Sequence, residues 1–279
     1  MDTVGAYAFA TSNWKELDFP LDLWLQWNSK FFDQIALVKY GDFSIETPSN
    51  VIVKEMDEVP RTGFNFYTIG KTEAQHLLST DWRLALDIDE FLNHKIDTSR
   101  LDRKKAYAIK MRNLYGNPLT EIINDMFPSY YFRLSYGIRS FKGDGGDLIH
   151  NEWKNRKKFE SYVRFGKRKL GIQNKPHYLT TKPYECCEVW HTGTLRDPAV
   201  MSKKWKEQTE REVNEGINTN KKRLEILDRP FDYHSFRELG NRVYLRKISS
   251  EEVPEIIIKN SGRFWKTDFS EDEYESRYF

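Results

Sequence analysis

Short β-prone runs alternate with helical patterns through the first ninety residues, and this alternation restricts the fold more than any other feature of the chain. Apolar residues at helical spacing predict a helix that begins after Pro20 and a second helix over 64–78. The predicted strands are residues 3–10, 35–40, 51–53 and 82–86. Strands separated by helices at this spacing are typical of parallel β-α-β units, so we expect an α/β protein.

The second half of the chain has a less regular pattern. It predicts a turn at Asn117-Pro118, a helix over 198–213 and a peripheral tail over 274–279. The predicted strands here are residues 106–112, 130–136 and 184–190. A chain of 279 residues is near the size at which one core stops growing, roughly 250–300 residues. We expect a catalytic domain over 1–215 and a C-terminal extension over 216–279 that packs on the same domain.

Composition excludes several classes of protein. Hydrophobic residues make up 39% and aromatic residues 15% of the chain, which excludes a disordered protein. No apolar run approaches the roughly 20 residues of a transmembrane helix, and no basic segment precedes the first apolar run, so a signal peptide is not expected. The two cysteines, Cys186 and Cys187, are adjacent, which indicates a reducing compartment. We expect a cytoplasmic protein, either dissolved or peripheral at a membrane surface.

Positive charge is concentrated in one segment. The whole chain has a net charge of +2, yet ten basic and two acidic residues lie in 151–182. Such a segment is either a solvated face or a surface for a partner that carries phosphate, such as a nucleotide, a lipid head group or a nucleic acid. Interleaved aromatic residues suit a buried strand face or base stacking equally. Nucleic-acid binding through 151–182 is therefore the alternative function.

Three carboxylates follow the fourth predicted strand directly, in the segment Leu84–Phe91 (LALDIDEF). Ligands of open α/β sheets bind at the carboxyl ends of strands, so Asp87, Asp89 and Glu90 are expected at the mouth of a crevice. Carboxylates two positions apart can present oxygens to Mg²⁺ or Mn²⁺, which also take waters and substrate phosphates as ligands. The other interpretation is that Asp87 and Asp89 cap a turn.

Two segments resemble motifs of glycosyltransferases with the GT-A fold, especially family 2-like members. Residues 82–92 (WRLALDIDEFL) are similar to their Asp-x-Asp segment, and residues 190–198 (WHTGTLRDP) are similar to a His-x-Gly-x-x-Arg-x-Pro segment. The resemblance spans roughly residues 3–210, although Asp42-Phe43-Ser44 stands where the family has a Ser-x-Asp-Gly turn. It implies an α/β fold with a GT-A-like nucleotide-binding sheet, flanking helices and an elaborated C-terminal half.

The resemblance also implies an activity: metal-dependent transfer of a hexosyl or pentosyl group, with inversion, from a nucleotide sugar to a hydroxyl acceptor. The acceptor would be a glycan, a lipid-linked group, a protein or a nucleic acid. Asp89 would ligate Mn²⁺ or Mg²⁺, which stabilises the leaving nucleoside diphosphate. His191 would be a further metal ligand or a hydrogen-bond donor to the diphosphate; without the resemblance, a hydrogen-bonded histidine of the core would be preferred.

By the same resemblance, the nucleotide-sugar site would contain Ala10, Thr11, Asp42, Lys71, Asp87, Arg196 and Lys203. Asp87 would contact the ribose or the water shell of the metal, and Asp42 the base or the ribose. A carboxylate must take the proton of the acceptor hydroxyl. Glu152 is the first candidate for this base and Asp147 the second, while an exposed Glu152 paired with a nearby lysine or arginine is an equally open interpretation.

Overall fold

The computed structural model describes residues 1–56, 65–103, 106–124, 130–137, 184–214, 225, 228 and 243–274. In this part of the chain ten strands form one mixed sheet. The strands are β1 (Val4–Thr11), β2 (Gln34–Tyr40), β3 (Val51–Met56), β4 (Trp82–Ala85), β5 (Glu90–Leu92), β6 (Ala106–Tyr115), β7 (Asn117–Asn124), β8 (Tyr130–Tyr136), β9 (Tyr184–Thr194) and β10 (Val243–Lys247). The helices are η1 (Ser12–Trp14), α1 (Leu21–Asn28), α2 (Asn65–Leu77), α4 (Pro198–Asn214), α7 (Glu255–Lys259), α8 (Ser261–Phe264) and η3 (Glu271–Glu273).

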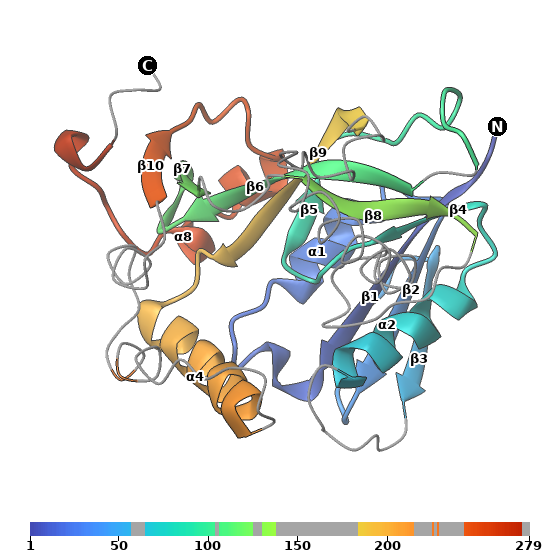
Figure 1. The fold of residues 1–279 in the computed structure, drawn as a ribbon, viewed down its shortest axis with the longest axis horizontal. Coiled ribbons are helices and arrows are strands. Elements are labelled where there is room, and N and C mark those ends of the chain that lie inside the picture. The colour runs from blue at the N-terminus through green and yellow to red at the C-terminus, as the bar shows by residue number, and fades with distance from the viewer. Residues whose placement is uncertain are drawn as a thin grey trace, which may run out of the picture.

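The sheet has a parallel half and an antiparallel half, in the order β10-β7-β6-β8-β4-β1-β2-β3. Strands β4, β1, β2 and β3 are parallel to one another, whereas β8 lies antiparallel to β4 and joins them to β6, β7 and β10 (Figure 1). Strand β9 runs parallel to β6 and antiparallel to β5. An α/β protein with a parallel core is therefore confirmed.

Strand β1 is buried on both faces, because a helix covers each of them. One side of β1 presents Val4, Ala6, Ala8 and Ala10 to a core that includes α1, and the other side presents Tyr7 and Phe9 to a core that includes α2. Parallel strands covered on both faces are expected to be apolar throughout, as β1 is. Gly70 lets α2 lie close to the sheet, since a Cβ at this position would collide with the Phe9 ring.

The order of the parallel strands changes direction beside β1. The chain passes from β1 to β2 on one side, continues to β3, and returns through α2 to β4 on the other side of β1. Ligands of doubly wound sheets bind where the connections leave neighbouring strands in opposite directions. This point lies between the carboxyl ends of β1 and β4, where the sequence places Thr11 and Asp87.

One expectation about the second half of the chain is wrong. Residues Asn117-Pro118 begin strand β7, and the turn before it lies at Gly116, whose φ of +69° suits glycine. Asparagine and proline favour a turn locally, but pairing between distant strands overrides such preferences. Of the predicted tail over 274–279, only Tyr274 lies within the described residues. Its hydroxyl lies 2.9 Å from Thr120 Oγ1 and it forms a bridge with Leu245, so this residue packs on the sheet.

None of the helices in the described ranges is both long enough and apolar enough to cross a membrane.

Candidate functional site

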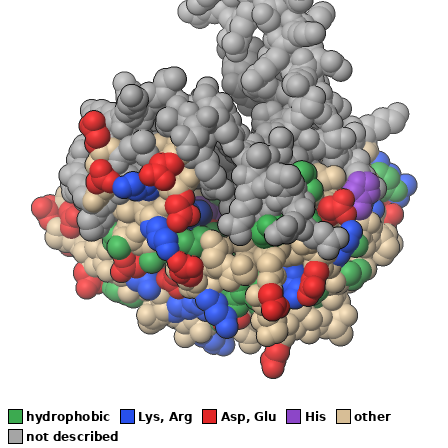
Figure 2. All heavy atoms as spheres, turned by 90° about the horizontal axis from the view of Figure 1, so that it is seen from below, with side chains coloured by type: hydrophobic (Ala, Val, Ile, Leu, Met, Phe, Trp, Pro, Cys, Tyr) green, Lys and Arg blue, Asp and Glu red, His purple; other side chains and the backbone are tan. Residues whose placement is uncertain are grey.

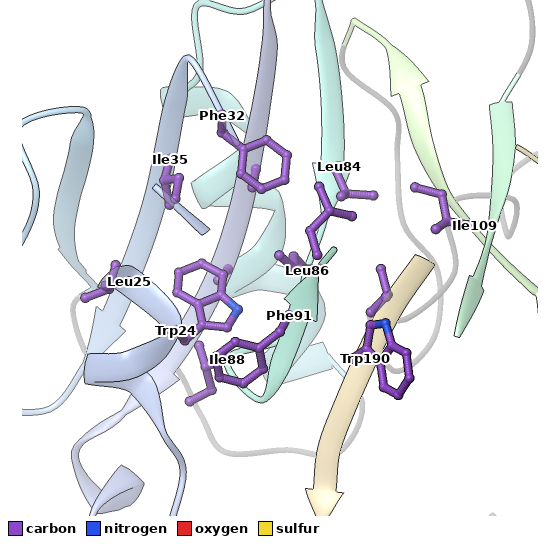
Figure 3. Packing of buried hydrophobic residues seen from close by; sticks show 14 of the residues in the cluster. Trp24, Leu25, Phe32, Ile35, Leu84, Leu86, Ile88, Phe91, Ile109 and Trp190 are labelled. Carbon is purple, nitrogen blue, oxygen red and sulfur yellow. The ribbon is translucent and has the colours of Figure 1, made fainter. Parts of the chain in front are cut away.

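The segment after β4 turns Asp87 toward the surface and buries Asp89. Leu86 N donates to Tyr7 O at 3.1 Å, so the chain still follows β1 beyond the end of β4. Ile88 is buried in the core beside Phe91 and Trp24 (Figure 3). Burial of Ile88 places its two neighbours on other sides of the chain, where the Asp87 side chain is 41% exposed and the Asp89 side chain only 4%.

The third carboxylate of this segment forms the turn. Glu90 Oε2 accepts a hydrogen bond of 2.7 Å from Asp87 N, and Glu90 N donates to Asp87 O at 3.0 Å. Turn capping, which the sequence offered as the alternative role for the acids, is thus performed by the Glu90 side chain. The carboxylates of Asp87 and Asp89 make other contacts.

Strand β9 brings the two motif segments together. Thr192 donates to Asp89 O from its backbone N at 2.8 Å and from its hydroxyl at 3.0 Å. In the adjacent register Glu90 of β5 stands opposite His191 of β9. Residues 82–92 and 190–198, about a hundred positions apart in the chain, therefore form one rigid unit around Asp89.

The Asp89 carboxylate lies among cationic groups. Its Oδ2 accepts a hydrogen bond from Arg196 Nη2 and lies 3.5 Å from His191 Nε2. Burial by itself would raise the pKa of the Asp89 carboxyl, but the neighbouring side chains of His191, Arg196 and Lys204 lower that pKa well below its usual range. Asp89 is consequently ionised over the whole physiological pH range.

Two further side chains shape the environment of His191. Its Nδ1 lies 2.9 Å from Asn113 Oδ1, on the neighbouring strand β6. On the other side, a Cβ at Gly193 would stand 2.9 Å from Asp89 Oδ2 and closer still to His191 Nε2. Only glycine at position 193 lets the backbone of β9 lie this close to both atoms.

Lys71 supplies the partner of Asp87. Its ammonium lies 2.6 Å from Asp87 Oδ1, and the Lys71 side chain is only 5% exposed. The lysine projects from α2, whose C-terminal carbonyls accept hydrogen bonds from Arg83 of β4. Helix α2 is thereby attached to the strand that carries the acidic segment, which places Lys71 beside it.

Arg196 and Lys204 share one aromatic ring. The Arg196 guanidinium lies 3.6 Å from the centroid of the Phe19 ring, and Lys204 Nζ lies 4.9 Å from it. Burial, followed by repulsion from Arg196, lowers the pKa of the Lys204 ammonium to about 8. Two positive charges are thus held near Asp89 by stacking on a neutral surface. The neighbouring Lys203 points elsewhere and forms an exposed ion pair with Glu16.

The other residues predicted to bind the nucleotide-sugar donor lie at the same edge of the sheet. Ala10 is buried in β1, and Thr11 ends that strand with its hydroxyl donating to Asn13 Oδ1. Asp42 is exposed after β2, where Gly41 packs against Ser12. The predicted bases Glu152 and Asp147 and the basic segment 151–182 lie outside the described residues.

Several residues of the site carry no recognisable signal in the sequence. Asn113 and Phe19 stand in unremarkable local patterns, and only the β6–β9 register and the Arg196 stacking show what they touch. Lys204 is indistinguishable from Lys203 until α4 is placed against Phe19. Gly193 does carry a signal, because it is the glycine of the His-x-Gly motif.

Among the described residues, no group of three or more His, Cys, Asp or Glu side chains is arranged to hold a metal ion. The Asp89–His191 pair nevertheless has a spacing that fits two ligands of one cation. Two ligand atoms each bind a metal at about 2.0–2.2 Å, and the angle between them lies between a right angle and the tetrahedral value. Such atoms are roughly 3–3.5 Å apart, and Asp89 Oδ2 and His191 Nε2 are 3.5 Å apart. In comparisons with known proteins, neither a protein-family model nor a curated protein sequence matches the chain.

Proposed function

We propose that this protein is a metal-dependent glycosyltransferase with a GT-A-like fold, which moves a sugar from a nucleotide-sugar donor to a hydroxyl acceptor with inversion. One observation carries the proposal: segments 82–92 and 190–198 converge on Asp89 at the carboxyl edge of β4, beside the end of β1. A nucleotide-binding crevice is expected at this point of a doubly wound sheet. The motif resemblance and the topology lead independently to the same edge.

Asp89 and His191 are the residues proposed to hold Mn²⁺ or Mg²⁺. Their 3.5 Å spacing supports this role. Such ions are commonly held by one or two protein ligands, with the remaining positions filled by waters and substrate phosphates. When bound, the ion supplies Lewis-acid stabilisation of the charge that develops on the leaving diphosphate.

The side chains around the acidic segment suit a diphosphate. Lys71 contacts Asp87, Arg196 contacts Asp89, and Lys204 stacks on the same ring as Arg196. In a crevice of low dielectric, fixed cations stabilise an anionic leaving group more strongly than water does. We assign the ribose and base of the donor to Asp87, Asp42 and the end of β1 at Ala10 and Thr11, with Lys203 at the rim.

Transfer needs a general base, and Glu152 is proposed first and Asp147 second. The base takes the proton of the acceptor hydroxyl while its oxygen attacks the anomeric carbon and the bond to the diphosphate breaks. Glu152→Gln should lower turnover by roughly 10²–10⁴-fold and leave donor affinity unchanged. A turnover near the wild-type value would transfer the role to Asp147.

The test of the proposed function is a donor screen. Hydrolysis or transfer is measured with a panel of nucleotide sugars in Mn²⁺, in Mg²⁺ and in EDTA, for the wild type and for His191→Ala. We expect one or a few donors to be consumed only with metal, and much more slowly by the variant. Consumption that is equal in EDTA contradicts the metal, and consumption of no donor in any condition contradicts the activity.

The alternative function, nucleic-acid binding, rests on the charge of 151–182. On the face of the molecule seen in Figure 2, the lysines and arginines of the described residues intermingle with aspartates and glutamates. The described part of that face therefore adds no basic patch to the one in the sequence. Binding to single-stranded oligonucleotides that falls steeply with salt would favour a nucleic acid as partner or acceptor.

A further inference from the structure

We propose that Arg263 of α8 is a positioning residue that fixes the ring of Phe19 against Arg196 and Lys204, and so sets the place of these two cations in the candidate site. The inference rests on the proposed function, in which fixed cations stabilise the leaving diphosphate. Arg263 lies 244 positions from Phe19 in the chain and outside both motif segments.

The Arg263 guanidinium holds the segment that carries Phe19 at several points. Its Nη2 donates to Phe19 O at 3.0 Å, and its Nη1 donates to the two carboxylate oxygens of Asp22 at 2.9 and 3.1 Å. Its Nε lies 3.9 Å from Asp18 Oδ1. A lysine could not make these contacts together, because its ammonium is a single point of charge whereas a guanidinium presents its N–H groups in a rigid fork.

The backbone of Phe19 is held at both of its polar groups. Its N–H donates to Trp14 O at 2.8 Å, and its carbonyl accepts the hydrogen bond from Arg263. The preceding residue, Asp18, has a φ of +52°, in the left-handed region that aspartate enters more readily than most residues. The chain therefore bends sharply just before Phe19, and the attachments on either side of the bend fix the direction in which the ring projects.

Helix α8 is itself anchored close to the candidate site. Phe264, the residue after Arg263, is buried and packs edge-on against Phe91 of β5, with the ring centroids 6.5 Å apart. Just beyond α8, Lys266 N donates to Gly116 O at 2.7 Å, between β6 and β7. The guanidinium thus projects from an element that is fixed to the same sheet as the candidate site.

The Phe19 ring is the support that both cations share. The Arg196 guanidinium lies 3.6 Å and Lys204 Nζ lies 4.9 Å from the ring centroid, within the roughly 6 Å over which a cation is attracted to a ring face. Like charges held side by side repel each other, so their arrangement depends on what supports them. A shift of Phe19 should therefore displace both cations, and Arg263 acts on them through this ring.

The experiment compares Arg263→Lys, which keeps the charge but loses the fork, with Phe19→Leu, which removes the ring, and with the double variant. Both side chains are only partly buried, so neither variant removes a side chain from the centre of the core. The readout is the affinity for inorganic pyrophosphate, measured by calorimetry in Mg²⁺ and again in EDTA. Lys204→Met tests whether pyrophosphate uses the cations at all.

Arg103→Lys is the matched control. Arg103 also binds an aspartate through two nitrogens, since it donates to Asp2 at 2.6 and 3.3 Å, and it stacks on the Tyr136 ring at 4.9 Å. Asp2 precedes β1 and Tyr136 pairs with the first residue of β4, so this cluster lies at the opposite end of the parallel strands from the candidate site.

We expect pyrophosphate affinity to fall roughly tenfold in Phe19→Leu and about three- to tenfold in Arg263→Lys, as the loss of one or two cation–π contacts implies. The double variant should bind within about twofold of Phe19→Leu, because residues that act through one another do not give additive losses. Arg103→Lys should lose stability but retain the wild-type affinity.

Equal affinity in the wild type and in Arg263→Lys overturns the inference and leaves the proposed function intact. So does a double variant whose loss is the product of the two single losses, since Arg263 would then act independently of Phe19. An equal loss in Arg103→Lys also overturns the inference, because it would reflect stability alone. Unchanged affinity in Lys204→Met, or a wild type that binds no pyrophosphate in either buffer, overturns the proposed diphosphate site and the inference with it.

Discussion

Two buried arginines of this protein meet carboxylates in different ways. Arg112 on β6 binds Glu121 through two nitrogens, at 2.9 and 3.2 Å, and Glu252 at 2.7 Å, while Arg246 also contacts Glu121. Arg196 contacts Asp89, whose neighbours are otherwise an imidazole at 3.5 Å and a lysine that stacks on a ring.

The difference lies in where each carboxylate stands in the fold. The Glu121 cluster joins β6, β7 and β10 through direct contacts, as expected of a structural network. The Asp89 carboxylate stands where the two motif segments meet, at the carboxyl edge of the parallel strands, with the backbone at Gly193 packed against it. Buried charge alone therefore does not distinguish the candidate site, whereas its place in the sheet does.

The largest expected effect separates the two clusters by activity. Asp89→Asn removes the ligand charge and should lower metal-stimulated transfer by about 10³-fold or more. Glu121→Gln makes the same chemical change beside the other arginine and should leave turnover per folded molecule within about threefold. Steady-state kinetics with the donor found in the screen, corrected for folded protein by circular dichroism, gives the answer; equal losses in both variants would break the comparison.

The free energy of unfolding is expected to fall more in Glu121→Gln than in Asp89→Asn. Glu121→Gln takes a charged partner from the buried Arg112 and from the half-buried Arg246, so its unfolding free energy should fall by about 3–5 kcal/mol. Urea denaturation followed by tryptophan fluorescence measures it. A fall below about 1 kcal/mol, the value of an exposed pair, would show that the β6–β7–β10 network does not stabilise the fold.

Gly193→Ala sharpens the comparison where the backbone packs closely against Asp89 and His191. The added methyl group would displace Asp89 Oδ2 and His191 Nε2, so Mn²⁺ affinity should fall roughly 10–100-fold, as for other disturbed ligand shells. Gly262→Ala is the control, since a Cβ there meets nothing within 4 Å. Both variants are compared by calorimetric titration with Mn²⁺. Unchanged affinity in Gly193→Ala would show that the positions of these two atoms do not matter for metal binding.

The smallest expected effect is a change of diphosphate affinity with pH. Lys204, with its pKa lowered to about 8, is protonated below that pH and neutral above it, so its attraction for a diphosphate is present near pH 7 and lost near pH 9. Affinity for nucleoside diphosphates should fall by roughly fivefold between these values, the equivalent of about 1 kcal/mol.

Lys204→Arg retains its charge throughout this range, so its affinity should stay flat. Measuring both proteins in the same buffers cancels the titration of the ligand itself. Parallel pH profiles would assign the dependence to another group.

Local patterns in the sequence were sufficient for the parallel half of the sheet and for the exposed position of Asp87 at its edge, whereas Asp89, expected at the mouth of a crevice, is buried. Strands β1, β2 and β4 and helix α2 lie within two residues of the predicted ranges, because apolar periodicity and the solvent-exposed end of a strand are properties of neighbouring residues. Strand β7 was missed, since a proline near its start resembles a turn when its pairing partners are unknown.

The relation between Asp87, Asp89 and the rest of the site depended on tertiary structure alone. The residues alone could not show that Glu90 caps the turn, that Asn113 reaches His191, or that Lys204 rather than Lys203 lies near Asp89. Each of these contacts joins residues through strand register or helix rotation. Both are decided by packing over the whole sheet, in which a shift of one residue would turn every side chain to the other face.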